Sequence, residues 1–194
     1  MADCILCGVG GQGTVLAGKL IATAALLSGK SVRGAETIGM AQRGGSVMSC
    51  LRIAGHSLSP LPPVGQAGLL LAFEPGEAVR CLPYLAAEGV AVVAARAVKP
   101  VTASLRGSKP YEAGQMLDYL QKKIKKLTIV DTDTLAERCG STKVVNVLLL
   151  GAAAQSGALG LTIEELAEAI RRVVPDKFRA MNLQALHLGA EACR

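Results

Sequence analysis

The chain has 194 residues, of which 51% are hydrophobic, and it carries a formal net charge of +6. This length suffices for one well-buried domain, so we expect residues 1–194 to form a single unit. With no Trp, three Tyr and two Phe, the chain lacks the aromatic residues of a platform that stacks nucleic-acid bases, and no uninterrupted apolar run is long enough to cross a membrane.

The first half of the chain alternates apolar runs with glycines and prolines. Strands are predicted at residues 3–8, 31–36, 46–53 and 69–73, with a helix over 13–27 and a loop over 55–65. A strand, a glycine turn, a helix and a second strand, in this order, predict that the first two strands pair in parallel. The run Glu74-Pro75-Gly76-Glu77 is typical of a helix start.

The second half continues the alternation and ends in helices. Strands are predicted at residues 90–94 and 127–130, with a candidate edge strand at 101–105, a helix over 113–123, and C-terminal helices over 143–156, 162–173 and 177–187. Thr162 and Glu165 have the spacing of a capping box. Strands that alternate with helices and are apolar on both faces predict an α/β fold: a three-layer sandwich with a Rossmann-like, largely parallel sheet and a helical C-terminal region.

Four lysines cluster at the end of the helix predicted over 113–123: Lys122, Lys123, Lys125 and Lys126. Cations at a helix C-terminus interact favourably with the helix dipole, so we interpret them as a solvated helix end. A docking patch for an acidic protein is the alternative.

The six cysteines are Cys4, Cys7, Cys50, Cys81, Cys139 and Cys193. The N-terminus does not resemble a signal peptide, so we expect a cytoplasmic protein with reduced thiols. Cys4 and Cys7 have the spacing of a redox or metal pair, but they lie in a short apolar run, and the chain has no second pair to complete a site. We interpret them as core residues and predict no metal and no cluster in this chain.

A glycine turn follows the first predicted strand. Gly8, Gly10 and Gly13 have the spacing of a dinucleotide-binding turn, in which the backbone approaches an anion at a helix N-terminus. Glu36 lies 23 residues after Gly13, about where such a site needs an acid for a ribose hydroxyl. Gln12 can satisfy hydrogen bonds of its own loop or point at a neighbouring loop. A tight turn without a ligand is the alternative.

A second glycine cluster, with Arg43 at its centre, follows Glu36 and has no role in a standard nicotinamide site. We expect the two loops to share a surface, and Arg43 either to bind an anion or to hold its own loop. The residues predicted to form this ligand or interface surface are Gly8, Gly10, Gly11, Gln12, Gly13, Gln42, Arg43, Gly44, Gly45 and Ser46.

Candidate catalytic groups are scarce. His56 and His187 have no neighbouring serine or cysteine in a triad pattern. Asp131 and Asp133 follow a strand, where ligands bind in α/β proteins, but Asp131 is also a favoured N-cap for the helix that starts there. We predict no catalytic residue in this chain, which is typical of one subunit of a larger enzyme.

Several motifs resemble one family when they are taken together. The segments Gly8-Val-Gly-Gly-Gln-Gly13 and Met40-Ala-Gln-Arg-Gly-Gly-Ser46 resemble the gamma-type subunit or domain of the 2-oxoacid:ferredoxin oxidoreductases. The segments Asn146-Val-Leu-Leu-Leu-Gly151 and Pro175-Asp-Lys-Phe178, with Asn182, are similar to the same family, and the branch that acts on indolepyruvate is the nearest likeness.

The resemblance implies a division of labour between two subunits. A large partner subunit would hold thiamine diphosphate and [4Fe–4S] clusters, and the complex would convert indolepyruvate or another aryl pyruvate to an acyl-CoA while ferredoxin accepts the electrons. This chain would bind none of these cofactors alone. It would pack against the partner and contribute loops to substrate or CoA access.

Three hypotheses therefore remain. A purely structural scaffold predicts no effect of any ligand and tolerates Arg43→Ala within an active complex. A subunit predicts an apolar face, with the lone chain poorly soluble, homodimeric or bound to a partner. A stand-alone dinucleotide-binding protein would use Gly8 to Gly13 for the pyrophosphate and Glu36 for the ribose.

Overall fold

A computed structural model describes residues 2–38, 44–54, 59–99 and 111–193. The strands are β1 (Ala2–Val9), β2 (Val32–Ile38), β3 (Ser46–Ile53), β4 (Ala67–Ala72), β5 (Leu85–Ala94) and β6 (Lys126–Val130). The helices are α1 (Thr14–Leu27), α2 (Pro75–Cys81), α3 (Ala113–Lys123), α4 (Thr132–Arg138), α5 (Val145–Gln155), α6 (Ile163–Val173) and α7 (Asp176–Glu191). Short 3₁₀ turns cover Leu82–Tyr84 and Thr142–Val144.

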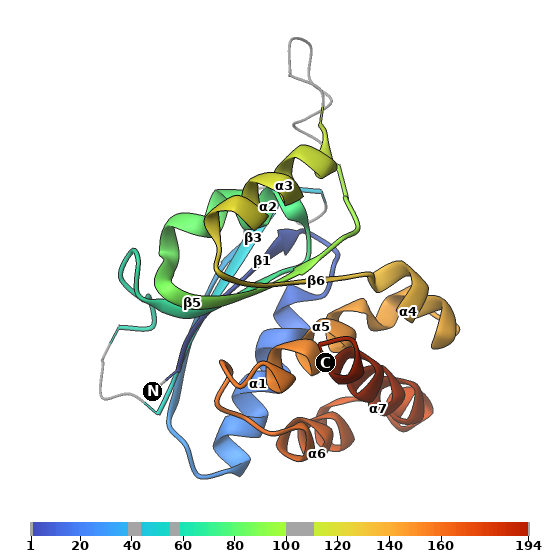
Figure 1. Cartoon of the computed structure of the whole chain (residues 1–194). Coiled ribbons are helices and arrows are strands. Elements are labelled where there is room, and N and C mark those ends of the chain that lie inside the picture. Colours follow the sequence, from blue (N-terminus) through green and yellow to red (C-terminus); the bar gives the residue numbers. More distant parts are fainter. Residues whose placement is uncertain (1, 39–43, 55–58, 100–110, 194) are drawn as a thin grey trace.

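The described strands form one mixed, mostly parallel sheet in the order β2-β3-β1-β4-β5-β6. β1, β4, β5 and β6 pair in parallel, whereas β3 is antiparallel to both β1 and β2. Helices α2 and α3 cover one face of the sheet, and α1 and the C-terminal helices cover the other (Figure 1). The predicted three-layer α/β fold with a largely parallel sheet and a helical C-terminal region is confirmed.

The predicted parallel pairing of the first two strands is wrong. β2 runs in the same direction as β1 but does not touch it, because β3 returns between them and pairs with both. The predicted edge strand at 101–105 lies outside the described residues.

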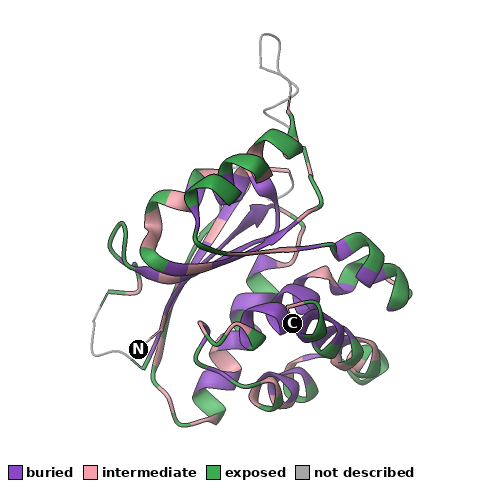
Figure 2. Ribbon diagram, in the orientation of Figure 1, coloured by how far each residue is buried: buried purple, intermediate pink, exposed green. Residues whose placement is uncertain are grey.

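The alternation of side chains along β1 explains why the sheet is covered on both faces. Cys4 and Leu6 pack into the core under α1 and α5, while Ile5 and Cys7 pack into the core under α2 and α3. Buried residues follow the central strands and α5, and the outer faces of the helices are exposed (Figure 2). Within the described ranges, no helix combines the length and apolar character required to cross a membrane.

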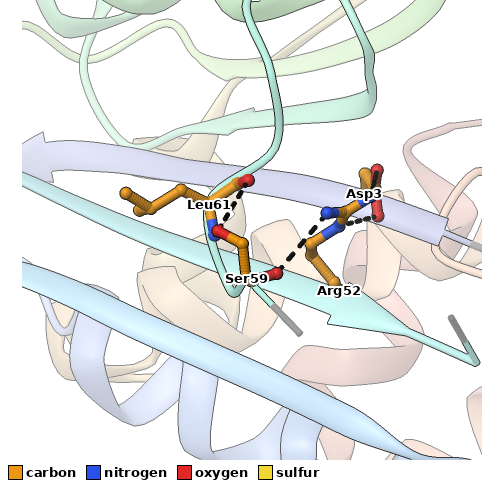
Figure 3. A network of polar contacts seen from close by, with 4 residues as sticks. All are labelled: Asp3, Arg52, Ser59 and Leu61. Carbon is orange, nitrogen blue, oxygen red and sulfur yellow. Dashed lines mark hydrogen bonds and ion pairs between the residues drawn. The ribbon is translucent and has the colours of Figure 1, made fainter. Parts of the chain in front are cut away.

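Two features hold neighbouring elements together, one within the sheet and one between helices. An ion pair joins β1 to β3, with Arg52 Nε and Nη2 each 3.0 Å from a carboxylate oxygen of Asp3 (Figure 3). Arg52 also donates to the carbonyl of Ser59 at 3.4 Å, which ties the following loop to the strand pair. On the opposite face, α5 and α7 cross at Gly151 and Gly189, where a Cβ atom at either position would lie about 2 Å or less from a backbone oxygen of the other helix.

Candidate functional site

The first glycine loop follows β1 and is closed by its own glutamine. Gln12 Oε1 accepts from the amide of Val9 at 2.7 Å, and Gln12 Nε2 donates to the carbonyl of Phe73 at 2.8 Å. Gln12 therefore satisfies its own loop and also binds the segment that follows β4. Gly8 faces this side chain so closely that a Cβ atom there would lie 2.8 Å from Gln12 Oε1.

The structure places the second glycine loop directly beside the first. The amide of Gly10 donates to the carbonyl of Gly45 at 2.7 Å, and the amide of Gly44 donates to the carbonyl of Gly10 at 3.1 Å. The loops meet because the start of β3 lies antiparallel to the end of β1, where Val9 pairs with Ser46. Gln42 and Arg43, as well as His56, lie outside the described residues.

A cavity of about 370 Å³ opens beside the first loop at the carboxyl edge of the sheet. It is lined by Gly11, Gln12, Gly13, Leu16, Arg96, Val98, Thr142, Lys143, Val145 and Asn146. Arg96 follows β5, and Lys143 precedes α5, so strands and helices far apart in the sequence bring two cations to one cavity. Helix α1 starts here after Gly13 without a side-chain cap and without an acidic residue in its first turn. Uncapped first-turn amides and two cations suit an anion.

Asn146, in the wall of this cavity, has an unsatisfied polar atom. The residue is 4% exposed, its Nδ2 atom lies 3.5 Å from the carbonyl of Gly13, and its Oδ1 atom is buried without a hydrogen-bond partner. A buried acceptor without a partner costs free energy. Asn146 therefore forms part of the cavity wall, while its Oδ1 atom is buried behind that wall.

Two apolar hollows adjoin the cavity, and Leu16 lines all three. A groove of about 550 Å³ runs between the first glycine loop, α1 and the start of β3 and is lined by Gly10, Gly11, Gly13, Thr14, Val15, Leu16, Lys19 and Val47. A pocket of about 320 Å³ is lined by Leu16, Ser141, Lys143, Val173, Val174, Pro175, Phe178, Met181 and Asn182. Val15, Leu16 and Phe178 are 37–44% exposed, so apolar surface surrounds the charged cavity.

The acids and the remaining histidine take structural positions. Asp131 caps α4, accepting from the amide of Thr134 at 3.2 Å, and hydrogen bonds from Thr134 lower the pKa of its carboxyl group. Asp133 pairs with Arg96 at 3.0 Å, and His187 is exposed on α7. Glu36 is exposed on β2, which β3 separates from the first glycine loop, so the standard arrangement of a ribose-binding acid beside β1 is not formed.

The described cysteines do not fit an iron–sulfur cluster or a zinc site. Cys4 and Cys7 are fully buried and point to opposite faces of β1, so their side chains cannot share a metal. Burial raises the pKa of Cys4 to about 12, which keeps its thiol protonated. Among the described residues, no group of three or more His, Cys, Asp or Glu side chains could hold a metal ion.

Sequence reasoning missed Arg96 and Lys143 as candidate site residues, and it noted Asn146 only as part of the resemblance. Arg96 could have been found because it follows a predicted strand, at the edge of the sheet where α/β proteins bind ligands. Lys143 and Asn146 gave no such sign, because their place beside Gly13 depends on how α5 packs.

Residues 3–192 match the family described as pyruvate ferredoxin/flavodoxin oxidoreductase. The chain belongs to this family. It is similar to the indolepyruvate oxidoreductase subunit IorB of Thermococcus kodakarensis, with 36% identity over 98% of this chain and 95% of the relative. It is also similar to the common gamma subunit of the pyruvate/ketoisovalerate oxidoreductases of Pyrococcus furiosus, with 29% identity over 92% of this chain and 89% of the relative.

Solved structures of this family have the same fold. The crystal structure of the gamma subunit of a keto/oxoacid ferredoxin oxidoreductase from Geobacter sulfurreducens has a TM-score of 0.72 and 25% identity, covering 100% of this chain and 98% of that one. The resemblance identified from the motifs is confirmed: the chain is a subunit of the 2-oxoacid:ferredoxin oxidoreductase type.

Proposed function

We propose that this chain is the gamma-type subunit of an oxidoreductase that converts indolepyruvate or another aryl pyruvate, CoA and oxidised ferredoxin to the acyl-CoA, carbon dioxide and reduced ferredoxin. The similarity to the IorB subunits supports the substrate class. Residues 1–194 act as one domain, and the complex works in the cytoplasm. The partner subunit supplies thiamine diphosphate, which provides the carbanion chemistry of decarboxylation, and the [4Fe–4S] clusters.

Within that complex, this chain binds and orients CoA. The observation that carries this role is the cavity lined by Arg96, Lys143 and Asn146 at the uncapped start of α1. Phosphate groups of CoA suit the cations and the amides. Gly11 and Gly13 leave room for a phosphate because neither has a side chain.

The predicted loop residues have two roles in this proposal. Gly11, Gln12 and Gly13 line the CoA cavity, and Gly8 and Gly10 belong to the same loop, which Gly44 and Gly45, just before Ser46, contact through Gly10. Gln42 and Arg43 lie outside the described residues, and their role as ligand or interface residues stays a prediction from the sequence. The apolar surface around Val15, Leu16 and Phe178 packs against the large subunit. None of these residues is assigned a bond-making step.

The first experiment is a gentle affinity purification of the tagged chain from its own anaerobic extract. We expect a stoichiometric large subunit with thiamine diphosphate and iron–sulfur clusters, and reduction of ferredoxin that requires both an aryl pyruvate and CoA. Recovery of the chain alone, stabilised by NAD or FAD, would instead support a dinucleotide-binding protein.

The second experiment tests the CoA cavity in the purified complex. Lys143→Ala and Arg96→Ala should each raise the KM for CoA about tenfold, since each removes one charge-assisted hydrogen bond to a phosphate. Lys125→Ala is the matched control, because Lys125 is 74% exposed and pairs with Glu88 away from the cavity. Equal KM values for all three variants would exclude this cavity as the CoA site.

A further inference from the structure

A partly buried polar network connects Ser46, at the start of β3, to α2. Glu77 is 5% exposed and accepts from the Ser46 hydroxyl, with 2.6 Å between Oγ and Oε2. The Arg80 guanidinium binds the same oxygen, with Nε at 2.8 Å and Nη2 at 2.7 Å. One carboxylate therefore joins the start of β3 to α2.

The neighbouring carboxylate holds Glu77 in place. Glu74, which is fully buried, accepts from the amide of Glu77 at 2.9 Å and also accepts from the hydroxyl of Tyr111. Burial raises the pKa of Glu74 above its ordinary value, although these hydrogen bonds oppose the rise. Glu74 fixes the first turn of α2, so the backbone that carries Glu77 has little freedom to move.

The hydrogen bond from Ser46 connects this network to the glycine loops. Gly44 and Gly45, just before Ser46, exchange two backbone hydrogen bonds with Gly10. Val47, just after Ser46, lines the groove between the first glycine loop, α1 and the start of β3. The position of Ser46 therefore sets both the contact between the two loops and one wall of the groove.

The stability of α2 does not explain all the contacts of Glu77. The pair of Glu77 and Arg80 lies within α2 and would stabilise that helix by itself, whereas the bond to Ser46 reaches another element. Breaking the polar contacts of a buried carboxylate costs free energy, so β3 cannot leave Glu77 without a penalty.

We propose that Glu77 is a positioning residue of the glycine-loop site: through Ser46 it holds the start of β3, and with it Gly44 and Gly45, against the first loop. The ligand of the site, CoA, rests on the proposed function. The positioning role itself concerns only this chain.

The test compares Glu77→Gln with Glu168→Gln in the purified complex. Glu168 is a matched control because it also pairs with arginines on its own helix, Arg171 and Arg172, but is exposed on α6. We expect Glu77→Gln to raise the KM for CoA about three- to tenfold with kcat nearly unchanged, because the neutral amide accepts more weakly from Ser46 and loses the ion pair with Arg80. Amide hydrogen exchange at residues 44–48 should become faster while that of α2 stays the same, and Glu168→Gln should change neither.

Variants of Ser46 test whether Glu77 acts through it. Ser46→Ala should reproduce the faster amide exchange at residues 44–48, whereas Ser46→Thr should keep the exchange slow because it retains the hydroxyl. In the double variant of Ser46→Ala and Glu77→Gln, exchange should be no faster than in the faster of the two single variants. Additive effects, or exchange that rises equally in α2 and at residues 44–48, would overturn the proposal. If Lys143→Ala and Arg96→Ala leave the KM for CoA unchanged, the proposed function fails. The hydrogen-exchange rates at residues 44–48 still decide whether Glu77 has the positioning role.

Discussion

At Gly13 two constraints meet at one residue. Its φ of +83° lies in the left-handed region, and a Cβ atom there would lie 2.9 Å from Asn146 Nδ2. Gly11 has a φ of +104° but has no atom within 4 Å of its Cβ position. The two glycines therefore separate the cost of backbone strain from the cost of a steric conflict.

We expect Gly11→Ala to lower the free energy of unfolding by about 1–3 kcal/mol through strain alone. Gly13→Ala should lower it further, because Asn146 must also shift. Urea unfolding of the two variants measures the difference. Equal losses would mean that Asn146 moves away at no cost.

At the scale of elements, the crossing of α5 and α7 depends on two glycines. A Cβ atom on Gly189 would lie 1.8 Å from the carbonyl oxygen of Leu148, which α5 cannot accommodate without moving away from α7. Gly114 on α3 has the opposite environment, with no atom within 4 Å of its Cβ position.

Gly189→Ala should therefore destabilise the protein by about 1–3 kcal/mol or more, as overpacking does. Gly114→Ala should stabilise it by about 0.5–1 kcal/mol, since alanine is the better helix former. Thermal unfolding of the two variants and the wild type measures these changes in stability. A lower stability of Gly114→Ala than of the wild type would contradict the prediction.

The capping box of α6 gives a pH dependence. The pKa of Glu165 is lowered below its ordinary value of 4.5, first by a hydrogen bond from Ser28 and then by the amide of Thr162 and by Lys30. A carboxyl group with a lowered pKa in the folded state stabilises the protein above its unfolded pKa and ceases to do so as the pH falls through the folded value.

We expect the wild-type protein to lose this contribution between about pH 5 and the lower pKa of Glu165 in the folded state. Glu165→Gln should remove that part of the pH dependence while leaving the curve above pH 5 nearly parallel to that of the wild type. Unfolding free energies measured from pH 3 to pH 7 provide the comparison, and identical slopes for both proteins below pH 5 would contradict it.

The local sequence pattern predicted most helices and strands, because the spacing of apolar residues and the capping residues involve positions that are close together in the sequence. The helix predicted over 113–123 has the same bounds in α3, and Thr162 and Glu165 form the predicted capping box. The partners of a strand cannot be predicted from its own residues. The apolar run of residues 46–53 does not indicate that this strand lies between β1 and β2. That Arg96 and Lys143 line the same cavity could not be predicted for the same reason, since three-dimensional packing brings them together.

On the scale of the whole molecule, the ion pair of Asp3 and Arg52 joins the N-terminal strand to the rest of the sheet. Their side chains are 6% and 11% exposed, so each charge depends on the other. Arg172, which pairs with Glu168 on α6, is 61% exposed and provides a solvent-exposed ion pair for comparison.

Arg52→Leu should lower the free energy of unfolding by about 3–5 kcal/mol, because it leaves the Asp3 carboxylate buried without its cation. Arg172→Leu should cost no more than about 1 kcal/mol. Chemical denaturation of both variants tests the contrast. Similar losses would mean that water reaches Asp3 when Arg52 is replaced.

The insertion of β3 between β1 and β2 also determines how the chain can be made. β1 leaves the ribosome before either of its partners, because β3 and β4 are synthesised only after α1 and β2. A nascent chain that ends before residue 46 therefore exposes an apolar strand with both edges open, the kind of segment that aggregates or recruits chaperones. Translation beyond β4 closes both edges, so the speed of synthesis through residues 46–72 sets how long the central strand of this subunit stays unprotected.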